Sequence, residues 1–172
     1  NLKTEEKYVL NGDRVFEAGS LYKIWLMAAV FEKIKKGELK EDEILTQKID
    51  VLNQKFEIAP ENAELTEGAI SFSVKSALEQ MITISHNYAA FLLTEKVGNA
   101  GIPIKTTAEN TGLFFEKIYK GELVSKEYSQ KMIEILKKQK LNDGLPKYLP
   151  KGVVVAHKTG DIGWFKHDGG IV

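Results

Sequence analysis

The sequence predicts an α+β domain in which helices pack against an antiparallel sheet. Three observations support this fold class: strand-like patterns lie near both ends of the chain, helical patterns fill its middle, and no internal repeat or low-complexity tract divides the 172 residues. Strands at both ends with helices between them are typical of a domain whose sheet is assembled from distant segments. We therefore expect one domain, residues 1–172, with a sheet built from residues 1–19 and 151–172 and a helical lobe over about 38–140. A chain of this length can bury a sizeable core.

The first strand-like segment lies close to the N-terminus, in the stretch EKYVLNGDRVF (6–16). We interpret its short apolar stretch as a strand with one buried face. Asn11-Gly12 follows, and this dipeptide is the strongest short-range signal for a two-residue hairpin turn. We therefore predict a strand, a turn and an extended approach to Ser20.

A helix is predicted from Ser20 to about Lys36. Ser20 is a favourable N-cap residue, Gly37 is a typical stop, and the residues between them are apolar on nearly every face. Such a helix is buried at the centre of a domain. Lys23 is the exception, because an unpaired buried ammonium is expensive. This lysine must therefore reach solvent along its stem, be paired, or be held at a lowered pKa for chemistry.

The remaining chain alternates between loops and regular elements. Residues 37–68 are polar and interrupted by Pro60 and Gly68, so we expect a loop with short elements. Helical spacing then resumes in four segments, namely 71–83, 87–98, about Thr107–Tyr119 and about Ser125–Lys138. The β-branched run VVVAHKTG (153–160) predicts a buried strand, and HDGGIV (167–172) predicts the start of another.

The composition excludes several classes of function. The 24 basic and 24 acidic residues cancel, so the chain has no electrostatic footprint for nucleic acid or an anionic membrane. It has no cysteine, and its histidines at 86, 157 and 167 form no ligand pattern, which argues against a metal site. The longest apolar run, about Ile24 to Phe31, is far too short to span a membrane, and no signal peptide is recognised in this chain. We expect no cofactor, no nucleic-acid partner and no membrane segment in this chain.

Three short patterns are the candidates for chemistry, namely Ser20-x-x-Lys23, Ser85-His86-Asn87 and Lys158-Thr159-Gly160. Each is weak by itself, since a serine cap followed by a lysine, a turn, and a strand that ends at a glycine explain them without any function. In this order and in these contexts, the chance of finding all three falls to about one per cent or less. Their combination therefore points to a common site.

The first two patterns supply a nucleophile, a base and their supports. Residues i and i+3 share one helix face, so the Ser20 hydroxyl and the Lys23 amine can meet at the helix N-terminus. A desolvated lysine has a lowered pKa and can accept the serine proton, while the helix N-terminus favours the developing negative charge. Ser20 is thus the predicted nucleophile and Lys23 the general base. Ser85 is expected to relay a proton toward the leaving nitrogen, and Asn87 to hold Lys23 or the substrate amide.

The third pattern supplies groups that bind a substrate. Lys158 provides positive charge for a substrate carboxylate, Thr159 provides a hydroxyl for the same group, and Gly160 leaves room for close approach. The backbone N–H groups of Ser20 and Asp161 can form an oxyanion pair. We therefore predict a small-molecule substrate that carries a carboxylate near an acyl group.

The sequence resembles the penicillin-recognising serine enzymes, the family of class A β-lactamases, penicillin-binding proteins and DD-peptidases. The resemblance rests on FEAGSLYKIWLMAAVFEKIKKGEL, SVKSALEQMITISHNYAAFLL and VAHKTGDIGW, which cover most of the chain in the family's order. It implies a β-lactamase/transpeptidase-like fold with the catalytic helix in the middle, and acylation of Ser20 by a β-lactam or a peptidoglycan-like D-Ala-D-Ala peptide. The stretches AAVFEKIKKGEL and ALEQMITISHN look most like the class A β-lactamase-related branch. The resemblance also implies a periplasmic or otherwise extracytoplasmic location.

Two features depart from the class A pattern. The middle of the second motif is His86, where class A enzymes carry Asp, and we interpret this histidine as a solvated or packing residue. The form S-x-N is common among penicillin-binding proteins. The E-x-x-L-N loop, whose glutamate activates the deacylating water, is not found, since Lys138 stands three residues before Leu141-Asn142. The sequence therefore supports the formation of an acyl-serine better than its hydrolysis.

The resemblance also predicts that some segments are missing. Only NAGIPIK (99–105) separates Gly98 from the next helix, where the family fits a further helix and the glutamate-bearing loop, and the chain ends at HDGGIV. We therefore expect the chain to lack terminal strands and the loop between 98 and 106, which leaves the sheet incomplete. Three functions stay open: a serine β-lactamase, a penicillin-binding DD-peptidase, and a non-enzymatic β-lactam sensor or inactive scaffold. No particular oligomeric state is predicted.

Overall fold

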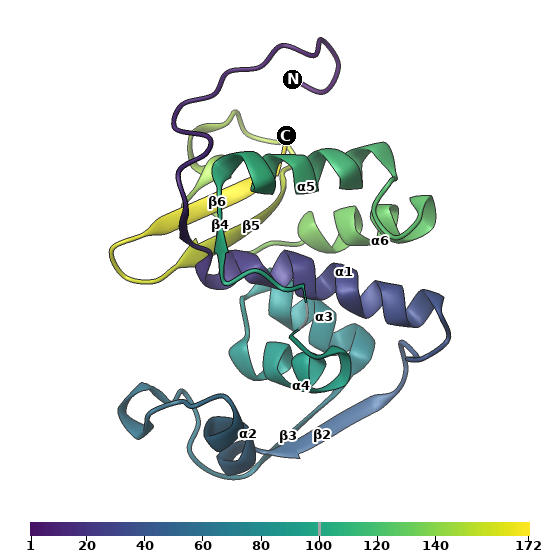
Figure 1. Ribbon diagram of the computed structural model, residues 1–172, viewed down its shortest axis with the longest axis vertical. Helices are drawn as coiled ribbons and strands as arrows, with labels where there is room; N and C mark the ends of the chain where they lie inside the picture. Colours follow the sequence, from purple (N-terminus) through teal and green to yellow (C-terminus); the bar gives the residue numbers. More distant parts are fainter. Residues whose placement is uncertain (100) are drawn as a thin grey trace.

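The computed structural model describes residues 1–99 and 101–172 and forms an α+β domain, which confirms the predicted fold class (Figure 1). Residue 100 lies outside the described residues, within the segment 98–106 where the sequence predicts a missing loop. The elements in chain order are β1 (Phe16–Glu17), η1 (Gly19–Leu21), α1 (Tyr22–Lys35), β2 (Ile44–Lys48), α2 (Ile49–Lys55), η2 (Pro60–Asn62), β3 (Ala69–Ser73), α3 (Val74–Thr83), α4 (Asn87–Val97), β4 (Lys105–Thr106), α5 (Ala108–Lys120), α6 (Lys126–Leu136), η3 (Leu145–Tyr148), β5 (Ala156–Asp161) and β6 (Lys166–Ile171). In the described part of the chain, no helix combines the length and the apolarity needed to cross a bilayer.

Helix α1 lies at the centre of the domain, as its apolar sequence predicts. Figure 1 shows it between α3 and α4 on one side and α5, α6 and the β5–β6 hairpin on the other. The side chains of Ile24, Met27 and Val30 are fully buried. Burial of each such side chain contributes about 1.5–3 kcal/mol. The first turn of α1 is therefore fixed by packing on both sides, and the candidate site is built there.

Local capping explains where the outer helices begin and end. The side chains of Ser73, Thr107 and Ser125 each accept a hydrogen bond from a backbone N–H of the first turn, and so cap α3, α5 and α6. Gly98 has a φ of 76° and ends α4, a backbone conformation that favours glycine. The predicted helices at 87–98, 107–119 and 125–138 are confirmed, whereas the first residues of the predicted helix 71–83 belong to strand β3.

Within residues 1–99 and 101–172, the strands form three separate antiparallel pairs, β1 with β4, β2 with β3, and β5 with β6. This corrects the expected sheet built jointly from residues 1–19 and 151–172, because β1 pairs with β4 from the middle of the chain. The two ends still meet through side chains. His167 Nε2 on β6 lies 3.0 Å from Glu17 O on β1, and its ring stacks on Phe16 with centroids 4.5 Å apart.

The predicted turn at Asn11-Gly12 is formed, but the predicted strand before it is not. Residues 6–10 carry no strand, and Tyr8 and Leu10 are 90% and 71% exposed. Asn11 does adopt the left-handed conformation of a turn residue, with a φ of 51°, and Arg14 N donates to Asn11 O at 3.1 Å. A short apolar stretch forms a strand only where a sheet face buries one side of it, and no such face covers residues 6–10.

Strand β2 lies within the polar segment 37–68 and pairs with β3 just after it, a hairpin that the sequence prediction lacks. Its strands pair in a register that sets Leu45 opposite Phe72. The prediction of a loop with short elements holds between the strands, where α2 and η2 lie. Closing this hairpin brings the residues after η2 toward the start of α4, which matters for the site.

Candidate active site

Ser20 lies in a 3₁₀ turn, one step before the regular helix. The prediction of Ser20 as the N-cap of α1 is wrong, since η1 spans Gly19–Leu21, α1 starts at Tyr22, and the N-cap Leu21 makes no side-chain cap bond. Gly19 causes this shape. Its φ is +51°, and a Cβ added there would lie 3.0 Å from Ile162 Cγ2, so the turn needs glycine at this point.

Lys23 follows on the first turn of α1 and its side chain is fully buried. Its Nζ donates to Ser85 O at 2.6 Å, to Ser85 Oγ at 3.2 Å and to Asn87 Oδ1 at 2.7 Å. Of the three possibilities that the sequence leaves open, the lysine does not reach solvent; it is hydrogen-bonded to uncharged acceptors. Burial, and then the nearby charge of Lys158, lower the pKa of Lys23 to about 7.

Ser85 connects the second pattern to both lysines. It lies between α3 and α4 with a φ of 61°, a conformation that non-glycine residues seldom adopt and that costs free energy unless the surroundings impose it. Its Oγ is 3.2 Å from Lys23 Nζ and 3.1 Å from Lys158 Nζ. Two buried amines therefore converge on one hydroxyl, which can pass a proton between them.

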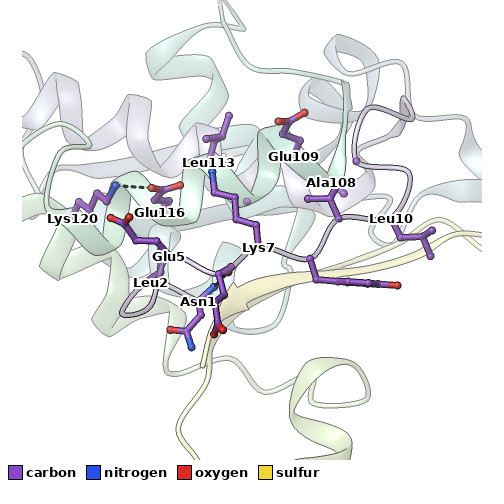
Figure 2. A pocket seen from close by; sticks show the side chains of 15 residues that line it. Asn1, Leu2, Glu5, Lys7, Leu10, Ala108, Glu109, Leu113, Glu116 and Lys120 are labelled. Atoms are coloured by element: carbon purple, nitrogen blue, oxygen red, sulfur yellow. Dashed lines mark hydrogen bonds and ion pairs between the residues drawn. The ribbon is translucent and has the colours of Figure 1, made fainter.

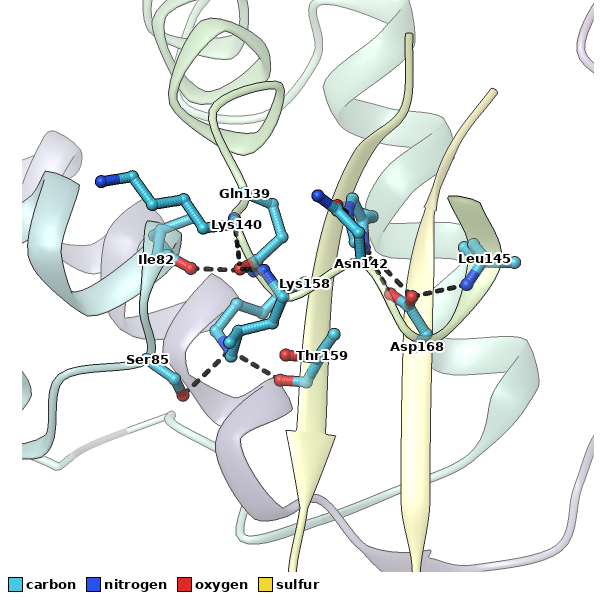
Figure 3. A network of polar contacts seen from close by, with 11 residues as sticks. Ile82, Ser85, Gln139, Lys140, Asn142, Leu145, Lys158, Thr159 and Asp168 are labelled. Carbon is cyan, nitrogen blue, oxygen red and sulfur yellow. Dashed lines mark hydrogen bonds and ion pairs between the residues drawn. The ribbon is translucent and has the colours of Figure 1, made fainter. Parts of the chain in front are cut away.

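Lys158 enters the site from strand β5. Its side chain is fully buried, and besides Ser85 its Nζ donates to Thr159 O at 2.6 Å (Figure 3). Burial lowers the pKa of Lys158 to about 7, against a smaller opposing effect of Asp168. A substrate carboxylate that replaced one of these neutral partners would favour the charged amine.

Gly160 and Asp161 bring β5 against the turn that holds Ser20. A Cβ added at Gly160 would lie 3.1 Å from Ala18 O and 3.3 Å from Leu21 N, so the strand and the turn touch backbone to backbone. The backbone nitrogen of Asp161 lies on the same side, 4.0 Å from an ideal Cβ on Gly19. The carboxylate of Asp161 is exposed and accepts a hydrogen bond from Gly163 N at 3.0 Å. This bond, together with the amine of Lys166, lowers the pKa of Asp161. The backbone amide of Asp161, rather than its side chain, faces the turn.

The structure thus brings the predicted residues of all three patterns to one place, with one exception. The direct hydrogen bond expected between Ser20 and Lys23 is absent from the described residues. Ser85 and Asn87 occupy the amine of Lys23 instead.

Two carboxylates near the lysines carry no sequence signal. Asn87 Nδ2 donates to Glu64 Oε1 at 2.6 Å, and Glu64 belongs to the polar loop before β3. Asp168 on β6 stands 2.8 Å from Nδ1 of buried His157, the residue before Lys158. Both contacts depend on strand registers, β2 with β3 and β5 with β6, that no local motif encodes.

His86 has a structural role. Its Nδ1 accepts from Ala89 N at 3.3 Å and so caps α4, and its half-buried ring contacts Phe72 edge-on at 5.5 Å. Burial lowers its pKa, which keeps the ring neutral and able to accept this bond. The interpretation of His86 as a packing residue is consistent with these contacts.

The site contains no ready metal-binding cluster, since within residues 1–99 and 101–172 no three His, Cys, Asp or Glu side chains gather in a ligand arrangement. A separate hollow of about 690 Å³ lies between residues 1–12 and one face of α5 (Figure 2). Its lining includes Glu116, paired with Lys120 at 2.6 Å. None of the site residues named above lines this hollow.

A nucleophile candidate at the start of a central helix, with one buried lysine on that helix and a serine and a second buried lysine from distant segments, defines the class of penicillin-recognising serine enzymes. The model of the Beta-lactamase enzyme family matches residues 1–172. The chain belongs to this family. It is a serine hydrolase of the kind that includes β-lactamases and penicillin-binding proteins. No curated protein matches the chain by sequence.

Solved structures show the same fold. A β-lactamase from Sphaerobacter thermophilus superposes with a TM-score of 0.82 at 24% identity, over 96% of this chain and 72% of that one. A β-lactamase from Chitinophaga pinensis gives a TM-score of 0.81 at 20% identity, over 98% and 76%. A variant of PBP-A, solved as an acyl-enzyme complex with penicillin G, gives 0.78 at 27% identity, over 94% and 69%.

Proposed function

We propose that the protein is an active-site-serine hydrolase of the β-lactamase type, acylated at Ser20 by β-lactams or by D-Ala-D-Ala-like peptides. The observation that carries this proposal is the convergence of the buried amines of Lys23 and Lys158 on Ser85 Oγ, beside the turn of Ser20. Such an arrangement can take a proton from one oxygen and deliver it to another atom without bulk water. The acyl-enzyme complex of PBP-A with penicillin G supports the choice of substrate class.

The acylation step follows from the protonation states of these groups. With a pKa of about 7, a large fraction of Lys23 is neutral at neutral pH and can accept the Ser20 proton. The Ser20 oxygen then forms a bond to the carbonyl carbon, and the bond from that carbon to the amide nitrogen breaks. Lys23 returns its proton through Ser85 to the leaving nitrogen. Atoms and charges balance, because the serine proton ends on that nitrogen.

Three groups are assigned to binding. The backbone amides of Ser20 and Asp161 hold the developing oxyanion, and the positive end of α1 adds to their effect. Lys158, with the hydroxyl of Thr159, holds the substrate carboxylate. The Lys158 amine has its pKa lowered by burial, so it takes full charge when an anion binds.

A second function, a penicillin-binding DD-peptidase, is favoured by one observation. No E-x-x-L-N glutamate is found, so the group that class A enzymes use for deacylation has no counterpart in the sequence. A third possibility, a β-lactam sensor or an inactive scaffold, shares the acylation site or only the fold. The three differ in whether an acyl-enzyme forms and in what then becomes of it.

Intact-mass spectrometry with benzylpenicillin separates these functions. A mass increase equal to one penicillin, absent from Ser20→Ala, supports acylation at this site. Turnover of a chromogenic cephalosporin identifies a β-lactamase, and a persistent adduct identifies a penicillin-binding protein or sensor. If a chain that includes any flanking segments shows no adduct and no turnover, the proposal is contradicted. The proposed substrates place the protein outside the cytoplasm, which cell fractionation tests.

A further inference from the structure

The loop that carries Glu64 is fastened to the start of α4 at two successive residues. Asn87 Nδ2 donates to Glu64 Oε1 at 2.6 Å. Tyr88 is 2% exposed, and its hydroxyl accepts a hydrogen bond from Leu65 N at 3.1 Å. The same hydroxyl lies 2.8 Å from both Leu65 O and Asn53 Oδ1. Glu64 is therefore held beside Asn87 by a buried anchor, although its own side chain is exposed.

This contact decides which end of the Asn87 amide faces Lys23. A carboxylate only accepts hydrogen bonds, so the NH₂ group of Asn87 must point to Glu64. The amide oxygen then points the other way, and it accepts from Lys23 Nζ at 2.7 Å. The opposite orientation would set an NH₂ group against an ammonium and an oxygen against a carboxylate.

Glu64 also balances the charges around Lys23. Lys158 faces the Lys23 amine from β5, His86 flanks it at the start of α4, and the Tyr22 ring lies 5.9 Å away on its own helix. Glu64 lies one amide group beyond, and its charge opposes that of Lys158 by raising the pKa of Lys23. Among the described residues, it is the carboxylate that acts on this amine.

We propose that Glu64 is a positioning residue that acts through Asn87, orienting the amide and setting the pH range in which Lys23 is a free base. Its effect on catalysis rests on the proposed function, while its effect on Lys23 does not. Two substitutions separate the effect of the Glu64 charge from that of its hydrogen bond with Asn87. Glu64→Gln keeps an oxygen that accepts from Asn87 but removes the charge, and Glu64→Leu removes both.

The direct test is an NMR titration of the Lys23 side chain in the unacylated protein, with ¹³C-labelled lysine and the signal assigned by its loss in Lys23→Met. We expect Glu64→Gln to lower the titration midpoint by on the order of half a pH unit, the effect of one charge a few ångströms away across a wet boundary. Glu67→Gln, a neighbouring exposed glutamate on the same loop, is the matched control and should leave the midpoint unchanged. An unchanged midpoint in Glu64→Gln overturns the proposal.

Acylation rates measured over the same pH range give the second readout. Glu64→Gln should shift the acidic limb of the rate profile to lower pH and keep the plateau rate. Glu64→Leu should lower the plateau as well, because Asn87 is then free to turn, and an unchanged plateau contradicts the orienting role. A wild-type protein that forms no adduct contradicts the proposed function alone, since the NMR midpoint still decides the role of Glu64.

Discussion

Replacement of Lys23 by methionine tests the buried amine through stability as well as chemistry. The pKa of Lys23 falls from its ordinary 10.5 to about 7 in the folded protein, with burial as the main cause. Between these values the unfolded chain binds one more proton at this residue than the folded chain does. The free energy of unfolding therefore rises with pH, by about 1.4 kcal/mol per pH unit for one proton.

The magnitude follows for an accessible window. From pH 7 to pH 9 the Lys23 contribution grows by about 2–3 kcal/mol, and Lys23→Met removes it. The wild-type protein should gain stability over the variant by this amount as the pH rises, and Lys23→Met should also abolish acylation while the fold persists. Tyr22, whose pKa is raised by burial to about 12, titrates above this window and does not interfere.

Urea unfolding followed by tryptophan fluorescence at pH 7, 8 and 9 measures these differences. Lys75→Met, at an exposed lysine on α3, is the control and should show the same pH dependence as the wild-type protein. Parallel pH profiles for the wild-type protein and Lys23→Met would refute the lowered pKa. Unchanged acylation of Lys23→Met would refute its role as the base.

Two further predictions concern the frame of the site. Gly19→Ala should lower the free energy of unfolding by about 1–2 kcal/mol, because φ is +51° and the added Cβ meets Ile162. It should also slow acylation by displacing the 3₁₀ turn. Thermal unfolding and adduct formation measure the two effects, and an unchanged melting temperature contradicts the strain. Asp168→Asn removes the charge that raises the pKa of Lys158, so penicillin should acylate this variant with a higher KM, most visibly above pH 7. Asp143→Asn, at an exposed position, is the control. Equal KM values in the two variants would contradict the effect of Asp168 on Lys158.

The sequence predicts the central features of the fold because they depend on local signals. The apolar run after Ser20 requires a buried helix, and capping residues and glycines bound the outer helices. It fails where the outcome depends on distant partners. Residues 6–10, which the sequence predicts as a strand, form none because no sheet lies beside them. Strands β2 and β3 pair although α2 and η2 separate them in the chain, and periodicity does not encode such a pairing.

The candidate site shows the same division. The three motifs name the lysines, Ser85 and Asn87, and the structure gathers them as expected. Glu64 and the 3₁₀ turn at Gly19 were not predicted, since one depends on loop closure and the other on a positive φ beside β5. The assignment of catalytic and binding roles, and the extracytoplasmic location, stay predictions.

The most direct test of the central claim is the site of the adduct. The protein is incubated with benzylpenicillin, quenched in acid, digested and analysed by tandem mass spectrometry. We predict one penicilloyl group on Ser20, in a peptide that is unmodified in Ser20→Ala. An adduct on any other residue, or one that survives in Ser20→Ala, would contradict it.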